Sequence, residues 1–425
     1  MTVTVFLGSL LGAMAIGMPI AFALLVCALA LMLFLGETDA QILAQNVVNG
    51  ADNFVLMAVP FFILAGELMN SGGLSRRIVD MILAWVGHIR GGLGYVAILA
   101  AVIMASLSGS AVADTAALAA LLIPMMRNAG YDVPRASGLI AAGGIIAPVI
   151  PPSIGFILFG VIGGVSITKL FLAGIVPGVL MGVSLVATWW WVARGEAQAA
   201  RPPVPLAERV RALLAGGWAL MMPVIIIGGL KTGAFTPTES SVVAAAYALF
   251  VGLVIYRELT PAAIYRAFLT TAKISAVVMF LVAAAVVSTY LITIADIPAQ
   301  LTAVLRPLVG TPTLLMLAMM GVVLVVGTAL DFIPTVLILT PVLLPLCKES
   351  GIDPVYFGVL FIINNAIGMI TPPVGVVLNV VSGVANVSFE KVVVGVWPFL
   401  VAETVVLLLL ILVPELVTVP LKWMF

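Results

Sequence analysis

The stretch ASLSGSAVADT, residues 105–115, places small polar side chains in the middle of an apolar run of roughly 36 residues. A second run of similar length is broken in the same way by GTALD at 327–331. Because a membrane-crossing helix needs about 20 apolar residues, each half of these runs is too short to cross comfortably. The pattern predicts two re-entrant helical hairpins, at about 91–127 and about 313–348, each returning to the side from which it enters.

The composition of the chain fits a membrane environment. Its 425 residues are 63% hydrophobic and 8% charged, with a mean hydropathy of +1.30, whereas a soluble domain carries about 25% charged residues. The 18 basic residues balance the 18 acidic ones, so no net charge attracts nucleic acid. A single histidine and two cysteines in apolar runs exclude His- or Cys-based catalytic and metal clusters. The sequence therefore predicts an all-α polytopic membrane protein that is not an enzyme and does not bind nucleic acid.

Further apolar runs have the length of membrane crossings. The first is far longer than the apolar core of a signal peptide, about 7–15 residues, and is expected to be a single retained span. The predicted crossings lie near 5–35, 54–70, 136–166, 169–193, 212–230, 238–256, 274–295, 355–386 and 393–414.

The positions of the basic residues predict the orientation, because cytoplasmic loops carry an excess of Lys and Arg. The acidic loop 36–53 suits the outside. The first hairpin then opens toward the cytoplasm and the second toward the outside. Thirteen of the 18 Lys and Arg residues fall in segments assigned to the cytoplasm, namely 71–90, 127–135, 194–211, 257–273 and 387–392.

The two hairpins belong to an internal repeat. The segment 124–152 aligns without a gap with 345–373, at a constant shift of 221 in the numbering that superposes Pro151-Pro152 on Pro372-Pro373. Two similar units of opposite orientation predict an inverted-repeat transporter fold with interrupted helices. We expect a first repeat at 1–194 with an interrupted helix at about 135–166, a polar cytoplasmic linker at 195–211, and a second repeat at 212–425 with an interrupted helix at about 355–386.

Each interrupted helix breaks at its Pro-Pro pair. Proline lacks an amide hydrogen and clashes with the preceding turn, so a pair of prolines opens the helix and frees carbonyl groups. Freed backbone at membrane depth is tolerated only when it is buried in protein or lines a watery cavity. Broken helices at the midplane of inverted repeats mark the binding site of secondary transporters, so we expect the site at these breaks.

Hydroxyl and carbonyl oxygens beside unwound backbone are ligands suited to Na⁺. A charge at the membrane centre costs about 2.5–3.5 kcal/mol, and Asp114 and Asp331 have no basic residue nearby in the sequence. A bound cation is the expected partner, and the alternative is that both aspartates only cap the helices that follow. The candidate sodium ligands are Ser108, Ser110, Asp114, Pro151 and Ser153 in the first repeat and Thr328, Asp331, Thr371 and Pro372 in the second, with Asn364 and Asn365 as candidate substrate contacts.

These motifs resemble a known family. The stretch 106–115, followed by Pro148-x-x-Pro151-Pro152-Ser153, looks like the large membrane subunit of TRAP (tripartite ATP-independent periplasmic) transporters, and LDFIPT at 330–335 with ITPPVG at 370–375 is similar to that family's second-repeat motif. The resemblance runs along the whole chain. Within the family, the likeness points to the subtype that carries 2,3-diketo-gulonate, a sugar acid.

The resemblance implies a sodium-coupled importer of an organic acid with an elevator-type motion in the bacterial inner membrane. It implies two partners, a small membrane subunit with about four spans and a periplasmic protein that delivers the carboxylate substrate. By resemblance, Ser108, Ser110 and Asp114 belong to one sodium site and Asp331 to the other.

Other functions of the two aspartates and the two hairpins stay open. Proton coupling through both carboxyl groups is one alternative, and a channel lined by the two hairpins is another. An intramembrane aspartyl protease is disfavoured, because the shift of 221 takes Asp114 to Thr335 and neither aspartate lies in a Gly-x-Gly-Asp motif. No Walker-type sequence is present, so ATP is not the expected energy source.

Overall fold

The computed structural model describes most of the chain, and it consists of helices with no strand among the described residues. Eight of these helices are long enough and apolar enough to cross a membrane. The all-α polytopic fold with interrupted helices is thereby confirmed. The described residues are 2–36, 39–194, 203–297, 300, 308 and 310–424.

The N-terminal segment differs from the prediction of one span at 5–35. It forms two helices, α1 (Thr2–Ala15) and α2 (Ile20–Leu35), which pack against each other. The break falls at Pro19, which lacks the amide hydrogen needed to continue α1 and stands at the N-cap of α2. The single-span prediction is therefore wrong.

Several segments expected to be loops are helical. Helix α3 (Ala40–Ala51) occupies most of the predicted outside loop, where the Asp39 carboxylate accepts a hydrogen bond of 2.9 Å from the amide of Gln41. Helix α5 (Leu74–Val86) occupies most of the predicted loop 71–90. Residues 37–38 of the outside loop lie outside the described residues. Periodicity of apolar residues was too weak a guide in these short amphipathic segments.

The first predicted hairpin is a pair of helices. Helix α4 (Ala58–Ser71), preceded by a 3-10 turn (Phe54–Met57), leads through α5 to α6 (Gly92–Ser108) and α7 (Ala111–Asn128). Gly109, between α6 and α7, has φ of +64°, a left-handed conformation that favours glycine.

The interrupted helices break where the proline pairs predict. Helix α8 (Val133–Gly144) resumes as α9 (Ile154–Gly163), and α17 (Pro354–Gly368) resumes as α18 (Val376–Ala385). Both Pro-Pro peptide bonds are cis. Each interrupted helix is followed by a long helix, α10 (Ile167–Ala193) and α19 (Phe389–Leu412) respectively, and α20 (Glu415–Met424) ends the described chain.

The middle of the chain contains three long helices before the second hairpin. They are α11 (Leu206–Thr232), α12 (Pro237–Phe250) extended by a π turn (Val251–Ile255), and α13 (Pro261–Ile294). Helix α13 begins well before the predicted start of its span at 274, so most of the predicted cytoplasmic loop 257–273 is helical. Residues 195–202 of the predicted linker lie outside the described residues, and from Leu206 the linker is already part of α11.

The second hairpin consists of α15 (Pro312–Ala329) and α16 (Phe332–Glu349). Each is 18 residues long and apolar enough to cross a membrane. At 18 residues, each half is slightly shorter than the roughly 20 residues of a comfortable crossing, as the sequence predicts.

The shift of 221 recurs in the helix ends. Applied to Ser108, the last residue of α6, it gives Ala329, the last residue of α15. Applied to Val133, the first residue of α8, it gives Pro354, the first residue of α17. The matching ends support a repeat of structure, while the outer boundaries of the two repeats, 1–194 and 212–425, stay a prediction.

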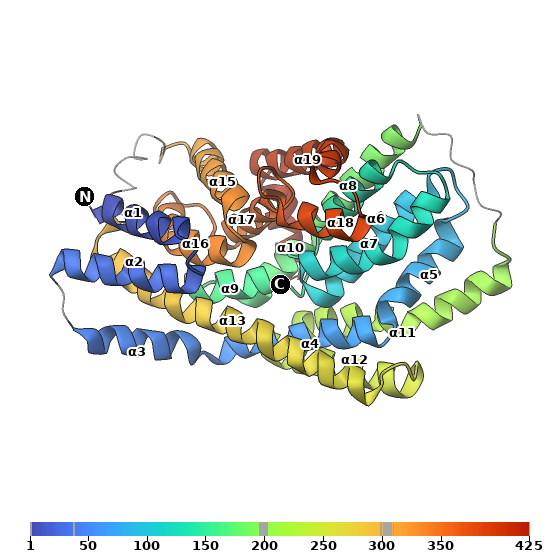
Figure 1. Cartoon of the computed structure of the whole chain (residues 1–425), viewed down its shortest axis with the longest axis horizontal. Helices are drawn as coiled ribbons and strands as arrows, with labels where there is room; N and C mark the ends of the chain where they lie inside the picture. The colour runs from blue at the N-terminus through green and yellow to red at the C-terminus, as the bar shows by residue number, and fades with distance from the viewer. Residues whose placement is uncertain are drawn as a thin grey trace.

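The two repeats pack reciprocally. Helix α7 of the first hairpin packs against α18, and α16 of the second hairpin packs against α9. In the same way α8 packs against α19, and α17 against α10. Figure 1 shows the two hairpins on either side of these central helices. The second half of each interrupted helix is therefore covered by the hairpin of the other repeat.

A second group of helices lies along one side of this assembly. Helix α13 packs against α2, α3 and α4, while α4 packs against α12 and α5 against α11. In Figure 1, α13 crosses below α16 and α9, with α3 beneath its left part and α4 and α12 beside its right part. The hairpins and interrupted helices thus face a second layer of helices. We call this layer the wall of long helices, after α13 and α11; it consists of α2, α3, α4, α5, α11, α12 and α13.

Candidate functional site

The tip of the first hairpin encloses a carboxyl group. Asp114, in the first turn of α7, is 1% exposed, and its Oδ1 accepts a hydrogen bond of 2.5 Å from the Ser108 hydroxyl. The Ser108 hydroxyl accepts in turn from the amide of Ser110 at 3.1 Å. The other carboxylate oxygen of Asp114, Oδ2, is buried and has no hydrogen-bond partner among the described residues. The structure therefore brings together three of the predicted ligands, Ser108, Ser110 and Asp114.

The first interruption closes over this tip. A Cβ atom at Gly109 would clash with the carbonyl oxygen of Pro152, so the hairpin tip touches the backbone of the Pro-Pro loop. Pro151 and Ser153 are both buried. The Ser153 hydroxyl donates to the Pro148 carbonyl and accepts from the amide of Phe156 at 3.1 Å, which caps α9.

A further hydroxyl, Thr115, was missed by the sequence analysis as a candidate ligand. It is fully buried, and its Oγ1 has no hydrogen-bond partner within the described part of the chain. A Cβ atom at Gly144 would clash with this oxygen, so α8 approaches α7 closely there. One indication of this residue was present in the sequence, namely that Thr115 directly follows the candidate ligand Asp114.

No basic side chain balances Asp114 in the described structure. Ion pairs of the described structure join Arg76 to Asp80 at 3.8 Å and Arg77 to Glu258 at 2.7 Å, both away from Asp114. A buried carboxylate needs a partner of opposite charge or a proton, because desolvation penalises an isolated charge. The unpartnered Oδ2 of Asp114, beside the Ser108 hydroxyl, is a hard oxygen of the kind that small cations bind, and the unpartnered Thr115 hydroxyl lies on the same turn of α7.

The tip of the second hairpin is more open. Asp331 stands at the N-cap of α16, but its side chain makes no capping hydrogen bond and is exposed. Thr328 and Thr371 are half-buried. Thr328 donates to the Val325 carbonyl of its own helix, and Thr371, in the loop after α17, donates to the Ile367 carbonyl, both at 2.8 Å. Pro372 is also half-buried. No hydrogen bond between these four predicted ligands is present in the described structure.

Asn364 and Asn365 lie against the second hairpin. The Asn364 amide donates to the Met320 carbonyl on α15 at 2.5 Å, and the Asn365 amide donates to the Phe332 carbonyl on α16 at 2.8 Å. Both side chains are buried, and both amide oxygens lack a hydrogen-bond partner among the described residues. Their role as substrate contacts stays a prediction.

The alternative that the aspartates serve only as helix caps is not what the structure shows. Helix α7 is capped by Ser110, whose hydroxyl accepts from the amide of Ala113 at 3.4 Å. Asp114 bonds to Ser108 instead, and Asp331 occupies a cap position without a capping bond. Neither carboxylate accepts a hydrogen bond from the first turn of its helix.

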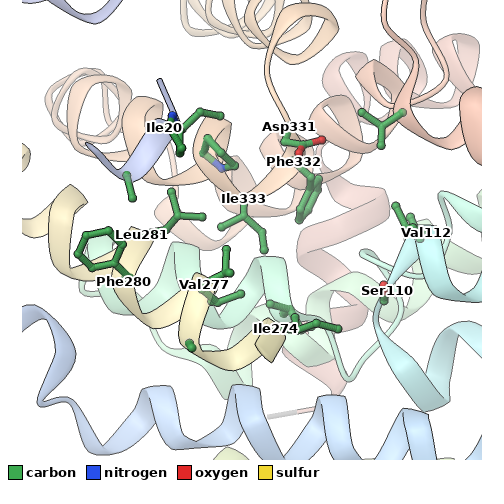
Figure 2. Close-up of a pocket in the computed structure, with 18 of the residues that line it drawn as sticks. Ile20, Ser110, Val112, Ile274, Val277, Phe280, Leu281, Asp331, Phe332 and Ile333 are labelled. Carbon is green, nitrogen blue, oxygen red and sulfur yellow. The ribbon is translucent and has the colours of Figure 1, made fainter. Parts of the chain in front are cut away.

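A cavity of about 1010 Å³ lies between the two hairpin tips and the wall of long helices. Figure 2 shows Ser110 and Val112 on one side of it, Asp331 and Phe332 on another, and Val277 and Phe280 of α13 opposite. Pro148 and Ile154 of the first interrupted helix and Met369 and Val376 of the second also line it, with Pro19 to Phe22 at the start of α2. Both hairpins and both interruptions therefore meet at one cavity.

Broken hairpins, interrupted helices and a shared central cavity define a polytopic membrane transport protein, a class in which discontinuous helices build the binding site. The chain belongs to the family of the tripartite ATP-independent periplasmic transporter, DctM component, whose pattern matches residues 7–416. The predictions of a TRAP large permease and of a protein that is not an enzyme are confirmed.

Named relatives match the chain over most or all of its length. It is 58% identical over 423 residues to the 2,3-diketo-L-gulonate TRAP transporter large permease of Escherichia coli (strain K12), covering 100% of each chain. It is 38% identical to the sialic acid TRAP transporter large permease of Vibrio cholerae, covering 95% of each chain. It is 35% identical to the C4-dicarboxylate TRAP transporter large permease of Pseudomonas aeruginosa, covering 91% of this chain and 90% of the relative.

A solved structure shares the fold. The crystal structure of the Alcanivorax borkumensis YdaH transporter, described as having an unusual topology, superposes with a TM-score of 0.64. The match covers 87% of this chain and 86% of that one at 15% sequence identity. At this identity the likeness concerns the fold alone.

Proposed function

We propose that this chain is the large permease of a sodium-coupled importer of an organic acid. The observation that carries the coupling is the enclosed carboxyl group of Asp114, which has hydroxyl neighbours and no basic partner among the described residues. A transporter that binds a cation there and releases it on the other side couples uptake to the sodium gradient. The membrane potential contributes about 2.3 kcal/mol per charge per 100 mV.

The two repeats supply the two proposed sodium sites. In the first, Ser108, Asp114 and Thr115 offer oxygens, and Ser110, Pro151 and Ser153 shape the enclosure. In the second, the unpartnered amide oxygens of Asn364 and Asn365 support a site beside the hairpin tip, with Asp331 at its open side. Thr328, Thr371 and Pro372 contribute through backbone or hydroxyl oxygens that retain acceptor capacity.

The proposed substrate is a sugar acid, 2,3-diketo-L-gulonate or a close relative. The support is the name of the Escherichia coli relative, 58% identical over its full length. The more distant relatives named for sialic acid and C4-dicarboxylates also carry carboxylates. A cavity of about 1010 Å³ is large enough for such a molecule.

The proposed partners follow from the tripartite family. They are a small membrane subunit with about four spans and a periplasmic binding protein that delivers the acid, with the complex in the bacterial inner membrane. An elevator-type motion is supported by the division of the helices into two groups, since the cavity lies between the hairpins with their interrupted helices and the wall formed with α13 and α2.

Reconstituted vesicles test the coupling. The chain is purified with its small subunit, and uptake of labelled 2,3-diketo-L-gulonate is measured with the loaded binding protein outside. We expect uptake under an inward sodium gradient and its loss when choline replaces sodium at constant pH. Uptake that persists undiminished without sodium and follows an imposed pH gradient would overturn sodium coupling in favour of proton coupling.

Counterflow tests the carrier against the channel. Vesicles loaded with unlabelled substrate are diluted into labelled substrate with binding protein and without any ion gradient. A carrier accumulates label transiently above its equilibrium level, because each half-cycle moves a bound molecule. Simple equilibration without an overshoot would show a channel and overturn the proposal.

A further inference from the structure

One basic residue lies where the sequence did not predict it. Lys273 was expected in a cytoplasmic loop, but it is the thirteenth residue of α13, a helix of 34 residues. It lines the cavity between the hairpin tips. Lys273 stands directly before the apolar run 274–294 of the same helix, where the cavity begins along α13. A charged residue that faces a cavity beside an apolar membrane segment is a candidate ligand contact.

The stretch 273–281 of α13 lines the cavity along most of its length, and Lys273 is the first residue of this stretch. The Lys273 side chain is exposed, so it is free to reach a ligand in the cavity. Figure 2 shows Val277 and Leu281 directed toward the cavity opposite Ile333 of α16. A lysine that only reaches toward lipid headgroups would lie on the face of α13 turned away from the hairpins.

The charges around the cavity are few and separated. Of the residues that line it, only Lys273 and Asp331 carry a formal charge, one on α13 and the other at the tip of the second hairpin. Neither takes part in an ion pair of the described structure. Most of the remaining lining is apolar, including Phe22, Phe280 and Phe332. An ammonium group at an apolar wall favours a ligand that brings a negative charge.

We propose that Lys273 binds the carboxylate of the transported acid and orients it in the cavity. The inference rests on the proposed function, since it names the contact through which the wall of long helices recognises the substrate. The ammonium group receives the carboxylate in a charge-assisted hydrogen bond. Asp331 lies on the other side of the cavity, so the single carboxylate of a sugar acid is directed to Lys273 and the hydroxyl-bearing end of the substrate points toward the second hairpin. The apolar side chains cover the carbon skeleton.

The test separates binding at the membrane site from delivery by the binding protein. In counterflow, the internal concentration of unlabelled 2,3-diketo-L-gulonate that gives half-maximal exchange reports the membrane site alone. We expect Lys273→Gln to raise this concentration at least about tenfold while the maximal exchange rate falls less, because a charge-assisted bond is lost. Lys273→Arg is expected to remain within about threefold of the wild type. The matched control is Lys231→Gln, an exposed lysine in the last turn of α11 away from the cavity, which should leave the concentration unchanged.

Two outcomes would overturn the inference. An unchanged half-maximal concentration in Lys273→Gln shows that the ammonium group does not bind the substrate. Equal losses of maximal rate in Lys273→Gln and Lys273→Arg, without a change in that concentration, show a structural role. These two outcomes are meaningful only if the wild type exchanges 2,3-diketo-L-gulonate normally. If the wild type does not exchange this acid, the proposed substrate and this inference are overturned together.

Discussion

The two hairpin tips share one backbone plan but place their polar groups differently. The shift of 221 takes Ser110 to Asp331 and Asp114 to Thr335, and it takes Gly144 of α8 to Asn365 of α17. In the first repeat the hairpin carries the buried carboxylate and the facing helix has a glycine. In the second the acid stands at the open tip, and the facing helix supplies the polar side chain.

This difference separates an enclosed site from an open one. Asp114 is 1% exposed beneath a loop whose residues 145–153 are all buried, whereas Asp331 is exposed and lines the cavity. An enclosed charge is held strongly but exchanges only when its surroundings move, while an exposed charge is screened and held weakly. A repeated fold can therefore provide two sites of different affinity without a change of topology.

The largest expected effect is at the enclosed carboxylate. Asp114→Asn keeps the size of the side chain but removes the charge, and we expect sodium-driven uptake to fall at least about 100-fold, since removing one partner of a buried ion pair costs about 3–5 kcal/mol. Asp331→Asn is the matched variant in the other repeat, and we expect it to raise the half-saturating sodium concentration by about tenfold or less because of screening. Initial rates in proteoliposomes at several sodium concentrations measure both. If Asp114→Asn shows the same uptake rate and the same sodium dependence as the wild type, the proposed difference between an enclosed and an open sodium site is wrong.

A smaller effect is expected where the first tip touches its loop. Gly109→Ala forces a side chain onto a left-handed residue and against the Pro152 carbonyl, whereas Gly130→Ala, at φ of +79°, meets no atom within 4 Å. The conformational cost of about 1 kcal/mol is common to both variants. The close contact adds about 1–3 kcal/mol for Gly109→Ala alone.

Thermal unfolding of the purified variants in detergent checks this difference. Gly109→Ala should unfold at a clearly lower temperature than Gly130→Ala and lose transport, while Gly130→Ala keeps it. Equal midpoints for the two variants would show that the tip does not close tightly on the Pro-Pro loop.

The smallest expected effect concerns the cap of α9. Ser153→Ala removes the bond to the Phe156 amide and the donation to the Pro148 carbonyl, and we expect a loss of about 1–2 kcal/mol of unfolding free energy. Ser166→Ala removes an exposed cap of α10, so its loss should stay below about 1 kcal/mol. Chemical denaturation of both variants in detergent provides the measurement, and a larger loss for Ser166→Ala would contradict the buried role of Ser153.

The sequence predicted the hairpins and interruptions well because strong local signals mark them. Gly109, with its left-handed backbone, and the proline pairs interrupt the helices, so helix ends fall within a few residues of the expected positions. The run 5–35 was misjudged because apolar length dominates the pattern, although Pro19 was visible within it. Length alone does not show that a chain turns back on itself.

Side-chain contacts between distant segments were harder to predict. The cluster around Asp114 was found because its members are near neighbours in the sequence. Lys273 was assigned to a loop, since a charge count cannot tell that α13 continues past it and faces the hairpins. The side-chain hydrogen bonds from Asn364 and Asn365 to the second hairpin depend on tertiary packing. The periodicity of the sequence does not predict such contacts between distant segments.

The reciprocal packing has a consequence for biosynthesis. Helix α9 ends at Gly163, and its partner α16 begins only at Phe332, in the second half of the chain. At roughly 5–20 residues per second, the ribosome needs on the order of ten to thirty seconds to make that partner. Throughout this interval the broken backbone of the first half is in the membrane without its final cover. The nascent first half must therefore be sheltered by the insertion machinery or by provisional contacts until the second half arrives.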